Sequence, residues 1–477
     1  MGNRQWAIGT RNFAGDRTGK RKQVNRNLND QKDEKRAGAE EIIRRLRREG
    51  FEAYFVGGSV RDFVRGVTPG DYDIATSALP GQVMSLFERT VAIGAKFGVV
   101  MVIAGGHSYE VATFRSDDSY EDGRRPTQVH FSSAQEDVLR RDFTINGLLM
   151  DVDTGEILDY VNGRADISKK IVRTIGDPAI RFNEDYLRML RAIRFAANLD
   201  FNLDPETEAA IHTCAENITR ISAERIAEEL GKILTRGGAR RGFEGMAAAG
   251  ILRQILPEVD RMRGILQPPR FHPEGDVWHH TMLMLDMLSK ETSPHTDPAL
   301  AWSALLHDVG KPVSRTEDEN GVHFYGHVKL GEGIADAILQ RLRISRSLRE
   351  TVISLIHHHM DFMNVRKMRP ARLKRFLRMP DFHLHLDLHR LDCLASHGML
   401  DYYDFCRSQL QNMDHEDLHP PRLLTGDDLL AIGFPPGKQI GAILRTLEEE
   451  QLENRIHDKD EAMAFVQDHW KSGMPTD

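Results

Sequence analysis

Asp71 and Asp73 are the side chains of this sequence whose types and spacing best suit a metal site. They alternate with Tyr72 and Ile74, as residues of a strand with one buried face do. Residues two apart on a strand point to the same face, so we expect both carboxylates on one side. Such a pair can hold two Mg²⁺ ions, one activating an attacking 3′-hydroxyl and the other holding a triphosphate.

Two glycines and a third carboxylate support this interpretation. Gly57 and Gly58 lie between an expected strand and an expected helix, where glycine lets the backbone approach a triphosphate. The first turn of that helix offers free N–H groups to an anion. Glu110 lies between apolar residues in an expected neighbouring strand, and we expect it to complete the carboxylate site.

The glycine pair, Arg61-Asp62 and the aspartate pair together resemble the polymerase-β-type nucleotidyltransferases. A closer resemblance is to the class II enzymes that add CCA or poly(A) to RNA, because RRDFTINGL and RFNEDYLRMLRAIRF match two further motifs of that family. The resemblance implies an α+β fold, with a polymerase-β-like head that has a small mixed sheet and uses two Mg²⁺ ions. The residues that it implies for nucleotide binding are Gly57, Gly58, Arg61, Asp62, Arg141, Asp142, Asn146, Asp185, Arg188, Arg191 and Arg194.

The resemblance also assigns roles within this set. It implies that Arg141 contacts the triphosphate, that Asp142 and Asn146 recognise the ribose, and that Arg191 and Arg194 extend toward the phosphates.

The choice of base can be reasoned from residue types. Asp185 and Arg188 are three apart on an expected helix, so they would share a face. A carboxylate accepts hydrogen bonds and a guanidinium donates them. Cytosine and adenine each present a donor beside an acceptor, which this pair complements, whereas guanine and uracil present the reverse order. A simple ion pair on the helix surface is the alternative interpretation.

A charged segment between Glu110 and Arg140 resembles the flexible loop of CCA-adding enzymes. Its Gly and Pro content is typical of a mobile loop, in which Asp122, Arg124 and Arg125 are the expected moving residues. The loop favours complete CCA addition. Poly(A) addition and partial (A-only or CC-only) addition stay open.

A histidine-rich block resembles the HD phosphohydrolases, with the adjacent His307-Asp308 pair as its signature. Imidazole and carboxylate groups suit a divalent transition metal or Mg²⁺. The resemblance implies that His280, His307, Asp308 and Asp392 form one metal site and that His327 and His359 bind a second metal. His357 and His358 compete with His359 for that position. Phosphodiesterase or phosphatase activity and a purely structural role both stay open.

The surrounding patterns predict the elements that position these residues. An amphipathic helix closed by Gly50, short strands and a hairpin from Val99 predict an α+β head, and 3.6-residue periodicity dominates after Asp177-Pro178. The expected domains are a disordered basic arm (1–36), the head (37–176), a helical neck that binds RNA and nucleotide (177–266), a helical HD domain (267–418) and a helical tail (419–477).

Composition limits the function classes. The chain has 477 residues, a net charge of −7 and three cysteines without C-x-x-C spacing, which predict neither disulfides nor a zinc site. No run approaches the roughly 20 apolar residues of a membrane span, and a cytoplasmic location without membrane contact is expected. Locally clustered arginines are compatible with RNA despite the acidic total.

We therefore expect a monomer or homodimer that acts on the 3′ end and acceptor or T-arm of tRNA with CTP and ATP. The alternative from another class is an HD phosphohydrolase whose head is a regulatory nucleotide sensor.

Overall fold

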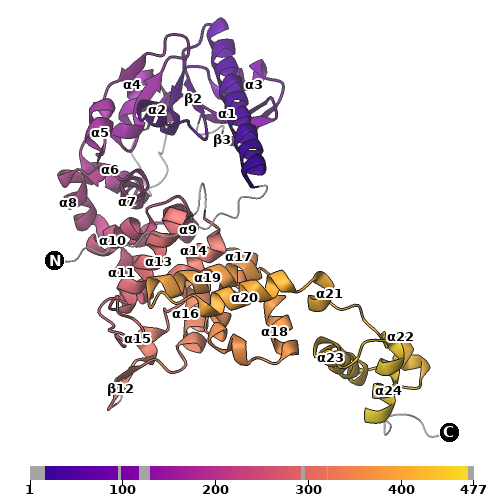
Figure 1. Cartoon of the computed structure of the whole chain (residues 1–477). Helices are drawn as coiled ribbons and strands as arrows, with labels where there is room; N and C mark the ends of the chain where they lie inside the picture. The colour runs from indigo at the N-terminus through magenta and orange to yellow at the C-terminus, as the bar shows by residue number, and fades with distance from the viewer. Residues whose placement is uncertain (1–16, 95–97, 118–128, 292–295, 320, 471–477) are drawn as a thin grey trace. The chain divides into compact units, whose positions relative to one another are not determined.

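The computed structural model describes residues 17–94, 98–117, 129–291, 296–319 and 321–470 (Figure 1). The chain divides into two compact units, residues 1–218 and 219–477. The α+β class is confirmed, because a sheet-containing head precedes a mostly helical remainder.

The first unit is built on a mixed sheet of seven strands in the order β3-β4-β5-β2-β1-β8-β9. Only β2 and β5 pair in parallel, and every other neighbouring pair in this sheet is antiparallel. The expected hairpin from Val99 is the antiparallel β4–β5 pair. The strands are β1 (Ala53–Val56), β2 (Asp73–Thr76), β3 (Thr90–Gly94), β4 (Val99–Ala104), β5 (His107–Thr113), β8 (Leu148–Met150) and β9 (Ile157–Asp159).

Helices and two short strand pairs complete this unit. The head helices are α1 (Arg17–Arg48), α2 (Gly58–Val64), α3 (Pro80–Leu86), α4 (Ala134–Leu139), the 3₁₀ turn Thr144–Asn146 and α5 (Gly163–Lys169). After them come α6 (Pro178–Glu184), α7 (Leu187–Leu199), α8 (Pro205–Cys214) and the 3₁₀ turn Ala215–Arg220, which runs past the unit boundary. The short pairs are β6 (Arg115–Asp117) with β7 (Val129–Phe131) and β10 (Ile171–Val172) with β11 (Asn202–Leu203).

Helix α1 corrects the expectation of a disordered arm over residues 1–36. The helix begins at Arg17, and only residues 1–16 lie outside the described part of that segment. The segment before Ala37 contains no proline and is rich in Arg, Lys and Gln, which are good helix formers. Polar composition therefore does not prevent the helix from extending toward the N-terminus.

Three Asp-Pro pairs start helices. Asp177, Asp204 and Asp297 each accept hydrogen bonds from backbone N–H groups of the next helix's first turn, in α6, α8 and α14 (Pro298–Leu306). Proline suits the first helical position because that position needs no N–H partner. The composition change at Asp177-Pro178 therefore has a direct structural cause.

The second unit is helical apart from the β12 (Thr316–Asp318) and β13 (Gly321–His323) hairpin, among its described residues. Its first helices are α9 (Ala223–Thr235), α10 (Ala239–Ala248), α11 (Leu252–Ile255) and α12 (Pro257–Asp260). The next are α13 (Val277–Glu291), α14, α15 (Lys311–Ser314), α16 (His327–Arg341), α17 (Arg346–His358), the 3₁₀ turn Asp361–Lys367, α18 (Pro370–Leu377), α19 (Phe382–Ala395), α20 (Asp401–Asn412) and α21 (His415–Leu418). The tail has α22 (Gly426–Ala431), α23 (Lys438–Leu452) and α24 (Lys459–His469).

The expected neck domain, residues 177–266, is divided between the two units at Ile218. Helix α6 packs against α8, and α7 packs against β10 and β11, whereas α9 packs against α13 and α14. The helices before Ile218 therefore pack within the first unit, and α9 packs within the second.

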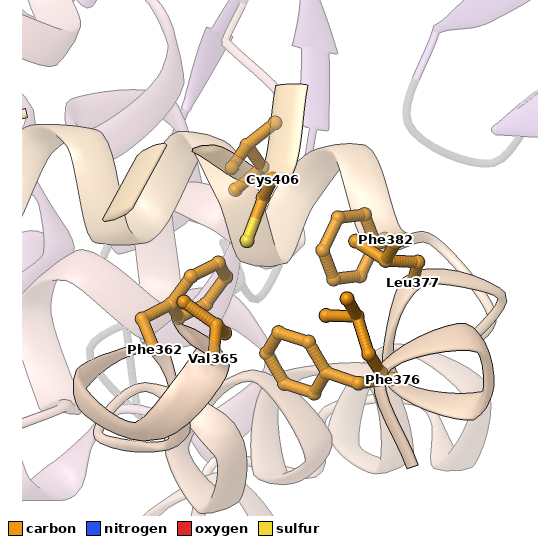
Figure 2. Close-up of a cluster of buried hydrophobic side chains, with 8 residues drawn as sticks. Phe362, Val365, Phe376, Leu377, Phe382 and Cys406 are labelled. Carbon is orange, nitrogen blue, oxygen red and sulfur yellow. The ribbon is translucent and has the colours of Figure 1, made fainter. Parts of the chain in front are cut away.

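The second unit has separate apolar clusters. Figure 2 shows one of them, in which Phe362, Phe376 and Phe382 surround the thiol of Cys406. The tail has its own cluster, which includes Leu429 of α22 and Phe434 of the segment between α22 and α23. Cys214, Cys393 and Cys406 are all free and buried. None of the described helices is both long and apolar enough to cross a membrane.

Candidate functional site

Three carboxylates meet where β2 and β5 lie side by side. Ile74 of β2 pairs with Val111 of β5, so the preceding residues, Asp73 and Glu110, are neighbours on parallel strands. Asp71 precedes the strand rather than lying on it, because β2 begins at Asp73, and the Asp71 side chain is 85% exposed. Burial, together with repulsion from Glu110 and Asp71, raises the pKa of Asp73 to about 6.

The glycine turn lies directly against this cluster. Gly57 has a φ of +68°, a left-handed conformation that favours glycine. A Cβ atom at Gly57 would lie 3.6 Å from Arg141 Nη1 and 3.8 Å from Asp73 Oδ2. A Cβ atom at Gly58 would lie 3.5 Å from Arg61 Nη2. A Cβ atom at either position would therefore touch one of these groups at ordinary van der Waals distance, and glycine leaves that space unfilled.

Arg141 is positioned by a residue outside the predicted set. Asp137 is buried and accepts hydrogen bonds from Arg141 (Nη2, 2.8 Å) and Arg140 (Nη2, 2.6 Å). Burial alone would raise the pKa of Asp137, but the Arg141 and Arg140 guanidinium groups hold it below its usual value. Asp137 lies three and four residues before these arginines on α4, a spacing from which it could have been found.

A polar relay joins the predicted nucleotide-binding residues. Arg61 donates to Asn146 Oδ1 (2.8 Å) and also pairs with Asp62 (3.0 Å). Asn146 in turn donates to Asp142 Oδ1 (3.3 Å), and Arg191 donates to Asp142 Oδ2 (2.6 Å). The structure thus links the segment after the glycine turn to helix α7 through side-chain contacts.

Phe195 is a second residue that the predicted set lacks. Three guanidinium groups face its ring, with centroid distances of 5.5 Å for Arg61, 5.5 Å for Arg191 and 4.1 Å for Arg194. Phe143 meets the same ring edge-on at 5.7 Å. Cations are attracted to an aromatic face, so this buried ring helps to hold arginines from α2 and α7 in place.

The expectation that Asp185 and Arg188 share a helix face is wrong. Helix α6 ends at Glu184, Asp185 has extended backbone angles, and α7 starts at Leu187. The Asp185 side chain accepts from the Leu187 N–H (3.1 Å), a local hydrogen bond by which aspartate favours such breaks. Arg188 pairs instead with Glu184, which also binds Arg181.

Lys35 of α1 also contacts the carboxylate site. Its Nζ lies 2.5 Å from Asp71 Oδ1 and 3.2 Å from the Gly70 carbonyl oxygen. The predicted loop residues Asp122, Arg124 and Arg125 lie outside the described residues.

In the second unit, the predicted histidine and aspartate ligands come from several helices. His280 (α13), His307 and Asp308 form one group of potential metal ligands, and Asp308, His327 and His359 form another, each within 4.8 Å. Asp392 of α19 lies 3.1 Å from His280 Nε2. His357 and His358 point their Nδ1 atoms to Glu332 (2.8 Å) and Asp361 (2.7 Å) instead.

The histidine tautomers suit a metal. His307, His327 and His359 direct Nδ1 to the backbone carbonyl three residues earlier, at 3.1, 2.8 and 2.6 Å. Nδ1 is therefore the donor and Nε2 carries the lone pair, the arrangement of metal-bound histidines. The buried Nε2 atoms of His280 and His307 lie beside carboxylate oxygens, 3.1 Å from Asp392 Oδ1 and 3.2 Å from Asp308 Oδ2, and the buried Nε2 atom of His327 has no hydrogen-bond partner among the described residues. This donor set fits a divalent cation.

Opposite charges lie next to each other within this group of histidines and aspartates. Lys311 lies 2.7 Å from Asp308 Oδ2 and donates to Gln267 Oε1 at 2.6 Å. Burial alone would raise the pKa of Asp308, but His307 and Lys311 hold it well below its usual value. Burial alone would lower the pKa of His280, but hydrogen bonds with Asp392 and Glu274 raise it to about 9.

Three family models match the chain in succession. Residues 53–173 match the poly A polymerase head domain, residues 200–263 match the probable RNA and SrmB-binding site of polymerase A, and residues 277–395 match the HD domain. The polymerase-type head implies the use of a divalent metal, and the HD match covers the histidine and aspartate cluster apart from Glu274 and His272.

Curated relatives named CCA-adding enzyme match about half of the chain. The Bacillus pumilus protein is 44% identical over 251 residues, which is 52% of this chain and 62% of the relative. The Geobacillus stearothermophilus protein is 48% identical over 217 residues, 45% of this chain and 53% of the relative. The matches thus span between half and two thirds of the relatives' length.

A solved structure covers more of the chain. The Bacillus stearothermophilus CCA-adding enzyme in complex with CTP has a TM-score of 0.66 and 26% identity, covering 91% of this chain and 98% of its own. The Thermotoga maritima CCA-adding enzyme complexed with tRNA shares the fold, with a TM-score of 0.53 and 18% identity.

Proposed function

We propose that the chain is a class II CCA-adding enzyme and that it adds C, C and A to tRNA 3′ ends. The substrates are CTP and ATP, and no nucleic-acid template is needed. The observation that carries the proposal is the cluster of Asp71, Asp73 and Glu110 beside the Arg141 guanidinium. We also propose that this activity is cytoplasmic.

The carboxylate cluster fits two Mg²⁺ ions, because the carboxylates that raise the pKa of Asp73 repel its charge, and cations between them would relieve that repulsion. When bound, these ions activate the RNA 3′-hydroxyl and neutralise the triphosphate. Arg141 then balances phosphate charge, and Gly57 keeps the space beside it open. The 3′-hydroxyl gives up its proton to water as its oxygen forms a bond to the α-phosphorus, the bond from that phosphorus to the bridging oxygen breaks, and pyrophosphate leaves with the bond's electrons.

Asp185 and Arg188 remain the proposed base-selecting pair. Asp185 accepts at the donor edge of cytosine or adenine, and Arg188 donates to the adjacent acceptor. The contact of Arg188 with Glu184 makes Glu184 the competing carboxylate for this role. Asp185→Ala should therefore relax base choice, with CTP and UTP incorporated at more similar rates. Glu184→Gln is the comparison, and if it relaxes base choice while Asp185→Ala does not, Glu184 is the selecting residue.

The overall proposal is tested with tRNAs that end before CCA, after C and after CC, each given CTP, ATP or both. Addition that stops at CCA supports it, whereas long A tails indicate poly(A) addition, and single-step products indicate a partial enzyme. Asp73→Ala should abolish incorporation. Glu156→Ala, which removes an exposed carboxylate of the same unit, should leave it unchanged.

A second activity is supported by the Nε2 atoms of His280, His307 and His327, which converge on the carboxylates of Asp308 and Asp392. We propose that this centre holds a divalent transition metal or Mg²⁺ and hydrolyses phosphate esters at RNA ends, such as 2′,3′-cyclic phosphates. His307→Asn should abolish hydrolysis of the cyclic phosphate to a terminal monoester while CCA addition continues. Asp73→Ala should have the reverse effect, and loss of both activities in either variant would contradict two separate centres.

A further inference from the structure

We propose that Glu274 is a positioning residue of the HD centre, the group of potential metal ligands formed by His280, His307, Asp308, His327, His359 and Asp392. Glu274 fixes the ring of His280 so that Nε2 faces Asp392 and a bound cation. The inference rests on the proposed metal binding by this centre. Glu274 precedes α13, and its side chain is only 6% exposed.

The contact geometry defines the tautomer of His280. Glu274 Oε1 lies 2.7 Å from His280 Nδ1 and 2.8 Å from His272 Nδ1. An ionised carboxylate only accepts hydrogen bonds, so both Nδ1 atoms are donors. Nε2 of His280 is then left as the atom that turns toward Asp392 Oδ1, 3.1 Å away. Two acceptors at this distance repel each other unless a proton or a metal cation lies between them.

His280 differs from the other three histidines in what holds it. His307, His327 and His359 direct Nδ1 to backbone carbonyl groups, which no substitution removes. His280 alone among the four uses a side chain, because its Nδ1 meets Glu274. Carboxylate partners of metal-bound histidines orient the ring and raise its basicity. Glu274 is thus the one anchor in this set that a single substitution can remove.

The preceding loop explains how a carboxylate reaches this position. Gly275 has a φ of +126°, and Asp276 accepts from the backbone N–H groups of Gly264 (2.6 Å) and His279 (2.7 Å). These contacts join both ends of the loop to the start of α13. Glu274 is therefore directed inward by a loop that is closed independently of its own side chain.

Titration of Mn²⁺ into metal-free protein tests the inference by calorimetry, with Asp73→Ala as the background so that the head contributes little binding. We expect Glu274→Gln to weaken Mn²⁺ binding about 10- to 100-fold, because the neutral amide oxygen accepts hydrogen bonds more weakly than a carboxylate and no longer raises the basicity of the His280 ring. Thermal melting in EDTA checks that the variant is folded. Glu274→Asp, which keeps the charge but shortens the side chain, should give an intermediate loss and serves as the test if the glutamine variant does not fold.

Glu332→Gln is the matched control. It removes the same carboxylate–imidazole contact, from His357 Nδ1 at 2.8 Å, at a histidine outside the metal-ligand groups. Its Mn²⁺ affinity should stay within twofold of the background protein. Equal affinity of Glu274→Gln and the background protein would overturn the inference alone. Absence of Mn²⁺ binding in the background protein would overturn the proposed metal site and this inference with it.

Discussion

Arg141 shows how much a site residue depends on a neighbour with no chemical role of its own. Asp137 is buried beneath it and pairs with both Arg140 and Arg141. Removing one partner of a buried ion pair leaves the others without compensation, which costs roughly 3 kcal/mol. We therefore expect Asp137→Asn to raise the KM for CTP and to lower the melting temperature of the first unit.

Steady-state kinetics and calorimetry measure the two effects. Arg140→Ala is the control, since it leaves the contact between Asp137 and Arg141 in place and should change the KM little. An unchanged KM in Asp137→Asn would show that Arg141 does not need this partner.

Asp151 provides a prediction of pH dependence. Burial alone would raise its pKa, but hydrogen bonds from Arg47 and from the Thr154 and Asp153 backbone N–H groups lower it to about 2. The ionised form is therefore favoured in the folded state, since the unfolded pKa is about 3.9. The contribution is complete above about pH 4 and is lost as the pH falls toward 2.

Solvent screening limits this contribution to about 1 kcal/mol. Asp151→Asn should accordingly melt below the unsubstituted protein at pH 7, and the difference should shrink at pH 2.5. Differential scanning calorimetry at both pH values measures it. A difference that stays constant with pH would exclude the ionised carboxylate as its source.

For single residues, the residue types in the sequence indicate the chemistry of the site but not the side-chain contacts within it. Asp71, Asp73 and Glu110 were expected together, and the sheet register makes Asp73 and Glu110 neighbours. The roles of Asp137, Phe195 and Glu274 did not emerge, because each depends on which arginine or histidine approaches it in the folded chain. The partner of Arg188 was also missed, since Asp185 leaves the helix to cap the next one.

Among the elements, the turn between β1 and α2 has the strictest backbone requirement. A side chain at Gly57 would adopt a left-handed φ, which costs on the order of 1–2 kcal/mol, and its Cβ would fill the space beside Arg141 and Asp73 at ordinary van der Waals distance. Gly57→Ala should therefore reduce CCA addition strongly and stability slightly.

Gly66 offers a matched comparison at the end of α2. Its φ is +72°, but a Cβ there would meet nothing within 4 Å. Gly66→Ala should lose similar stability and keep its activity, as judged by thermal melting and nucleotide incorporation. Equal activity of the two variants would show that Gly57 is needed only for its backbone conformation and not for the space beside Arg141 and Asp73.

Element types were more predictable than their limits. The glycine turn, the β4–β5 hairpin and the amphipathic α7 follow from local patterns of glycine and apolar residues. The start of α1 does not, because a polar helix lacks the apolar periodicity that would mark it. The break at Asp185 was also hidden, since the apolar spacing continues across it.

At the scale of the molecule, the head site and the HD centre belong to different compact units. A ligand stabilises the unit that binds it, by about 2.7 kcal/mol at a concentration 100 times its Kd. Hydrogen exchange should thus slow in residues 53–200 when CTP and Mg²⁺ are added to the His307→Asn protein. Mn²⁺ added to Asp73→Ala should instead slow exchange in residues 277–395.

Protection of both units by either ligand would contradict this assignment. The order of head and HD regions was predictable because each carries its own motifs. The boundary at Ile218 was not, because the helices on its two sides have the same periodicity and differ only in what they pack against.

The three cysteines of the natural chain can serve as internal probes of local opening. All are buried, and burial raises the pKa of the Cys393 and Cys406 thiols to about 12. A thiol reagent can modify them only when the surrounding structure opens, so labelling rates report the frequency of opening. Labelling of Cys214 reports opening at the end of α8, and labelling of Cys393 reports opening of α19, the helix that carries Asp392. Labelling of Cys406 reports opening of the aromatic cluster of Figure 2. The opening of three separate regions can thus be followed without introducing a single label site.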